Sequence, residues 1–67
     1  MNITDQMLES LYAATLQTRQ GFTTLIPAIE NIARGDPRAK DILSVAAKYK
    51  KVEQLMIQIE KDLKQLL

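Results

Sequence analysis

Hydrophobic residues recur along the chain with a spacing typical of packed α-helices. In the second half, positions alternate at steps of three and four, and they are Ile42, Val45, Tyr49, Val52, Met56, Ile59, Leu63 and Leu66. The first half repeats this alternation at Leu8, Leu11, Thr15, Thr18, Phe22, Leu25, Ile29 and Ile32. Such a series lies on one face of a helix. The pattern predicts two helices of about 30 residues each, or about 45 Å in length.

The segment Arg34-Gly35-Asp36-Pro37 separates the two series. Glycine suits the left-handed conformation just past a helix end, aspartate is a favoured N-cap, and proline is tolerated in a first helical turn. We therefore predict helix 1 over about 3–34, a turn at 35–36 and helix 2 over about 37–66. At the start of helix 1, Asn2 is expected to act as the cap, with Asp5 three residues later.

A chain that folds back at this turn brings residues of the two series together when their numbers add to 70 or 71. Phe22 then meets Tyr49, and Arg19 lies opposite Glu53 on one side. Because two independent series agree through one turn, the sequence predicts a single domain over 1–67. Its fold class is all-α, an antiparallel two-helix coiled-coil hairpin.

Pro27 lies inside the predicted helix 1. Proline removes a backbone N–H and clashes with the preceding turn, so we expect a kink near 22–27. The hydroxyl of Thr23 or Thr24 is expected to compensate the freed carbonyl, and two shorter helices are the alternative. Thr15 and Thr18 are expected to bring hydroxyls between the helices and to soften the middle of the hairpin.

A hairpin of two helices buries few side chains, which favours a second packed face. The predicted register gathers a group of leftover residues on one side, and we expect this group to bind a protein partner: Tyr12, Leu16, Ile26, Leu43, Ala46 and Ile57. Small residues with Met7 form a column on the other side: Met7, Ala14, Gly21 and Ala28. The alternative is that single exposed apolar side chains have no special role.

The amino-acid composition limits the kinds of chemistry that we expect of this chain. The 67 residues include no Cys and no His, and the net charge is +1. Without the usual thiolates and imidazoles, we expect no catalytic residues, no metal site, no cofactor and no small-molecule substrate. The near-neutral charge argues against nucleic-acid binding. No apolar run would insert into a membrane, and the start of the sequence does not look like a secretory signal, so a soluble cytoplasmic protein is expected.

Several short segments of the chain resemble a known family of small proteins. They are the turn Ile32-Ala33-Arg34-Gly35-Asp36, then Ala39-Lys40, then Lys51-Val52-Glu53, and finally an apolar tail. In length and layout the chain resembles the small co-chaperones of type III secretion needle subunits, the YscE/PscE-like proteins. The resemblance implies a cytoplasmic bacterial protein that binds a larger helical-repeat chaperone, so that the needle subunit does not polymerise before export. Pro27 and Pro37 have no counterpart in that family pattern.

Three alternatives remain open. The chain could be the needle subunit itself, which is also a helical hairpin with a proline-containing turn. It could be a structural or regulatory coiled-coil protein that self-associates as a four-helix dimer. A nucleic-acid accessory role for helix 2, with seven cations against four acids, is the third.

Overall fold

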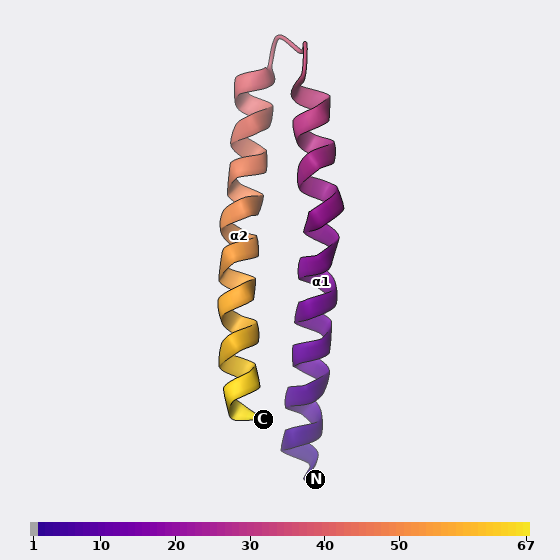
Figure 1. Cartoon of the computed structure of the whole chain (residues 1–67), viewed down its shortest axis with the longest axis vertical. Coiled ribbons are helices and arrows are strands. Elements are labelled where there is room, and N and C mark those ends of the chain that lie inside the picture. Colours follow the sequence, from indigo (N-terminus) through magenta and orange to yellow (C-terminus); the bar gives the residue numbers. More distant parts are fainter. Residues whose placement is uncertain (1) are drawn as a thin grey trace.

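The computed structural model describes residues 2–67, which form two long helices lying side by side in opposite directions (Figure 1). Helix α1 spans Ile3–Ala33 and helix α2 spans Ala39–Leu66. The molecule measures 54 × 15 × 12 Å. The all-α helical hairpin predicted from the heptad pattern is thereby confirmed. In Figure 1 the first turns of α1 extend beyond the C-terminal end of α2.

The beginning of α1 is capped as the sequence indicated. The side-chain oxygen of Asn2 accepts a hydrogen bond from the backbone N–H of Asp5 at 2.8 Å. This bond satisfies one of the N–H groups that a helix leaves free in its first turn. At the other end, Gly35 has φ of 74°, which only glycine adopts without strain, and the N–H of Asp36 donates to the Ala33 carbonyl at 3.2 Å.

The connection between the helices is longer than predicted. It comprises residues 34–38, and α2 begins at Ala39, two residues later than expected. Asp36 does act as a cap, but on the tight turn before α2: its side chain accepts the Arg38 N–H at 2.8 Å and its carbonyl accepts the Ala39 N–H at 3.0 Å. Arg38 has φ −95° and ψ 17°, so the helical conformation starts only after it.

The Asp36 carboxylate also pairs with the Arg38 guanidinium, with Oδ1 3.1 Å from Nε. The hydrogen bonds from the Arg38 side chain and backbone lower the pKa of Asp36 below its ordinary value of 3.8. A lowered folded-state pKa stabilises the fold above the ordinary value, and this stabilisation disappears as the pH falls through the lowered pKa.

We therefore expect Asp36→Asn to be less stable than the natural sequence at neutral pH, with a difference that shrinks below pH 3.8. Urea unfolding followed by circular dichroism between neutral and strongly acidic pH would measure both proteins. Because the other carboxylates are common to both proteins, the difference isolates Asp36. A difference that does not change with pH would show that the carboxylate charge has no part in the connection.

Pro27 does not break α1. The helix is continuous from Ile3 to Ala33, so the alternative of two shorter helices is wrong, and the ribbon bends only gently along its length (Figure 1). The Thr23 hydroxyl donates to the carbonyl of Gln20 at 2.7 Å, and therefore does not compensate the carbonyl that Pro27 leaves free. Ile26, beside the proline, is buried between the helices, so this turn of α1 packs against α2.

Candidate interaction surface

Each helix contributes two columns of residues to the interface between α1 and α2. On each helix, one of these two columns was predicted correctly. The buried and half-buried positions that match the prediction are Leu8, Thr15, Phe22 and Ile29 on α1 and Ile42, Tyr49, Met56 and Leu63 on α2. The rings of Phe22 and Tyr49 meet edge to face, with centroids 5.6 Å apart, which confirms this predicted pair.

The second predicted column of each helix was wrong. Leu11, Thr18, Leu25 and Ile32 on α1, and Val45, Val52, Ile59 and Leu66 on α2, are all exposed. Their places between the helices are taken by Tyr12, Arg19, Ile26 and Ala33 and by Ala46, Glu53 and Glu60. Both choices have the same three–four spacing, so periodicity alone does not distinguish them.

Side-chain size near the turn explains which column lies inside. The connection of residues 34–38 holds the helix ends close together, and the residues that this second column contributes there are Ala33 and Ala46, each only 2% exposed. Bulkier side chains at these places would push the helices apart. Ile32 and Val45, which the prediction placed inside, are turned outward.

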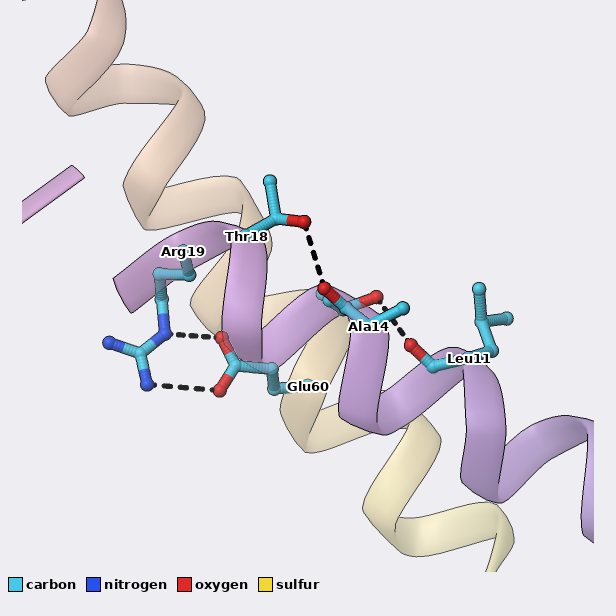
Figure 2. A network of polar contacts seen from close by, with 6 residues as sticks. Leu11, Ala14, Thr18, Arg19 and Glu60 are labelled. Atoms are coloured by element: carbon cyan, nitrogen blue, oxygen red, sulfur yellow. Dashed lines mark hydrogen bonds and ion pairs between the residues drawn. The ribbon is translucent and has the colours of Figure 1, made fainter. Parts of the chain in front are cut away.

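Arg19 and Glu60 form the polar contact at the middle of the interface (Figure 2). Arg19 lies on α1 and Glu60 on α2, and the guanidinium binds both carboxylate oxygens, with Nη2 3.1 Å from Oε1. The prediction that Arg19 pairs directly with Glu53 is therefore wrong. The bond to Glu60 raises the pKa of Arg19, and Glu53 adds only a weaker electrostatic effect.

The two threonines do not leave hydroxyl groups unsatisfied. Thr18 is exposed and donates to the Ala14 carbonyl at 2.8 Å, and half-buried Thr15 donates to the Leu11 carbonyl at the same distance. Figure 2 shows the Thr18 bond running along α1, beside the Arg19–Glu60 pair. Each hydroxyl bonds to its own helix, and only Thr15 lies between the helices, so the prediction that Thr18 also lies there is wrong.

The exposed columns of the two helices lie on the same side of the hairpin. Each outward residue follows an interface residue by three positions in both helices, as Leu25 follows Phe22 and Val52 follows Tyr49. In an antiparallel pair, equivalent positions of this kind flank one side of the interface. We call this side the apolar flank; its members are Leu11, Thr18, Leu25, Ile32, Val45, Val52, Ile59 and Leu66.

The opposite side, which we call the charged flank, has a different character. Its members are Glu9, Leu16, Thr23, Glu30, Leu43, Lys50, Ile57 and Lys64. Lys50 reaches across to Glu30, with Nζ 3.2 Å from the carboxylate. Exposed pairs of this kind are typical of surfaces that face water. The hairpin thus has one side rich in large apolar residues and one side with charges of both signs.

The residues predicted to bind a partner belong to the charged flank or to the interface. Ile26 and Ala46 are buried between the helices, 6% and 2% exposed, so neither faces a partner in the folded hairpin. Tyr12, Leu16 and Ile57 are half-buried, and Leu43 is exposed. The predicted set is therefore divided between the charged flank and the interface, because the prediction placed the column of Leu25 inside the hairpin and that of Ile26 outside.

The apolar flank was missed as a surface for the same reason. One signal was available in the sequence: between Ser10 and Ile29, the only charged residue of α1 is Arg19. An isolated charge in a long uncharged helix indicates either a paired interior position or a site of contact, and here its carboxylate partner lies inside the hairpin.

Within residues 2–67, no three acidic side chains cluster in a way that would hold a metal ion, and no buried side-chain nitrogen or oxygen lacks a hydrogen-bond partner. Neither α1 nor α2 combines the length and apolar character required to cross a membrane. Comparison of the chain with protein-family models, with curated proteins and with solved structures finds no match.

Proposed function

We propose that the chain is a non-catalytic protein-interaction module that binds a helical partner through the apolar flank. The observation that carries this proposal is the exposure of seven large apolar side chains on one side of the hairpin, whereas the buried apolar core within residues 2–67 has four residues, Ile26, Ala33, Ala46 and Leu63. Contiguous apolar surface on a small protein is typical of interaction sites. An elongated, ridged surface of this kind fits a groove between helices.

The resemblance to co-chaperones of type III secretion needle subunits supports a more specific form of this proposal. In that form, the partner is a helical-repeat chaperone, and the complex keeps the needle subunit soluble before export. The uncharged character of the apolar flank agrees with this role, because charged residues are depleted at the centres of protein interfaces.

Co-expression tests the proposed partner. The chain would be produced together with the needle subunit and the helical-repeat chaperone encoded in the same genome, and the complex would be isolated by affinity and size-exclusion chromatography. We expect a stable complex that Val52→Lys disrupts, because a lysine at the centre of the contact loses its hydration. Leu43→Lys is the control: Leu43 is 45% and Val52 44% exposed, on opposite sides of the hairpin.

The outcomes separate the parts of the proposal. Failure of the three proteins to associate would contradict the co-chaperone role. A complex that tolerates Val52→Lys but not Leu43→Lys would place the contact on the charged flank, close to Leu16 and Ile57, which were predicted to bind a partner. Filaments of the chain alone would favour the needle subunit.

A further inference from the structure

We propose that, when no other protein is bound, the apolar flank is covered by a second copy of this chain, so that two hairpins form a four-helix dimer. This inference rests on the proposed function, because it assigns an occupant to the same apolar flank. It also adds a step to that function, since the dimer must open before another helical protein can take the place of the second copy.

The first argument is the exposed area. The chain exposes 5227 Å² of surface, whereas a compact monomer of its mass, 7.6 kDa, is expected to expose about 4,300 Å². The excess is about 900 Å², close to the roughly 800 Å² that one partner contributes to a stable interface of standard size. A second hairpin along the 54 Å length of the first would cover an area of this order.

The second argument is the charge of the surface. Two identical surfaces carry identical charges, so a surface that binds its own copy must avoid a block of one sign. No member of the apolar flank is charged, and the charges next to it on α2 are mixed in sign: Asp41, Lys48 and Asp62. The charged flank, with Glu9, Glu30, Lys50 and Lys64, would lose its hydration in a similar contact.

The third argument is the contrast between the helices. Over its 31 residues α1 carries four charged side chains, whereas α2 carries ten over 28 residues. Next to the apolar flank, α1 presents Met7, Ala14, Gly21 and Ala28, and a Cβ atom added to Gly21 would meet nothing within 4 Å. A helix that is apolar over more than one face is typical of a bundle in which it has more than one neighbour.

Sedimentation equilibrium on the isolated chain tests the dimer. From low micromolar to near millimolar concentration, the mass should rise from that of one chain, 7.6 kDa, to twice this value and then stay constant. Val52→Lys should raise the dissociation constant of the dimer by about 100-fold or more, because each copy would bury a lysine. Leu43→Lys, equally exposed on the charged flank, should leave the constant within a few-fold of the natural value.

A mass that remains that of one chain at all concentrations would overturn the proposal, and so would assemblies that grow beyond two chains. Equal weakening by the two lysine variants would overturn the placement on the apolar flank. Circular dichroism would show whether Val52→Lys remains helical; if it unfolds, the concentration dependence of the natural chain still decides between monomer and dimer. A monomeric natural chain that binds the helical-repeat chaperone would contradict the dimer and leave the proposed function standing.

Discussion

Replacing Arg19 by alanine is expected to lower the midpoint of thermal unfolding by about 10 °C, because the Glu60 carboxylate loses its partner between the helices. The side chain of Glu60 is only 11% exposed, so water replaces the guanidinium poorly. Circular dichroism melting curves at one fixed protein concentration would measure the change, since the proposed dimer makes stability depend on concentration.

Two further variants make this prediction specific. Lys50→Ala breaks the exposed pair with Glu30 and should change the midpoint little. The double variant Arg19→Met with Glu60→Leu should recover the natural midpoint or exceed it, because well-packed apolar residues often replace a buried ion pair without loss of stability. If Arg19→Ala and Lys50→Ala had the same small effect, the Arg19–Glu60 pair would have to be accessible to water.

The second large effect is a gain of stability. Pro27→Ala is expected to raise the free energy of unfolding by about 2 kcal/mol, since proline is about 3 kcal/mol less favourable than alanine inside a helix. Because α1 is already continuous through this position, the alanine N–H can bond to the Thr23 carbonyl without a change of fold. Urea unfolding at fixed protein concentration would give the free energy.

Gly21→Ala provides the comparison for Pro27→Ala. It also improves helix propensity in α1, by about 1 kcal/mol, but restores no hydrogen bond. A Cβ atom at Gly21 has open space in the hairpin. If Gly21→Ala stabilises the chain and Pro27→Ala does not, the gentle bend of α1 is needed for its packing on α2, and straightening it costs contacts.

The sequence was sufficient to predict the two helices and their antiparallel arrangement. The three–four alternation, Gly35, Asp36 and Asn2 all have local physical meanings, and each has the predicted role or one close to it. Each of these features is determined by residues a few positions away along the chain, so it can be predicted from the sequence. The face of each helix that lies inside depends on the other helix, and the prediction failed there.

Three adjacent columns of α1 contain apolar residues, and any neighbouring two would give the same spacing. The choice between Leu25 and Ile26 for the interior depends on how closely the helices approach, which the alanines near the turn decide. The choice of Glu60 over Glu53 as the partner of Arg19 depends on how far one helix is shifted along its axis relative to the other. Both glutamates lie in the same column, one heptad apart, so the sequence pattern offered two equivalent partners.

The short connection also affects the order in which the hairpin assembles. Closing the loop between Ala33 and Ala46 costs about 1 kcal/mol less chain entropy than closing the roughly threefold longer loop between Arg19 and Glu60. The left-handed Gly35 and the Asp36 cap reduce the freedom of this loop further before any side chains pack. Folding therefore starts most readily at the turn and proceeds towards the termini, so the ends of the helices pair last and separate first.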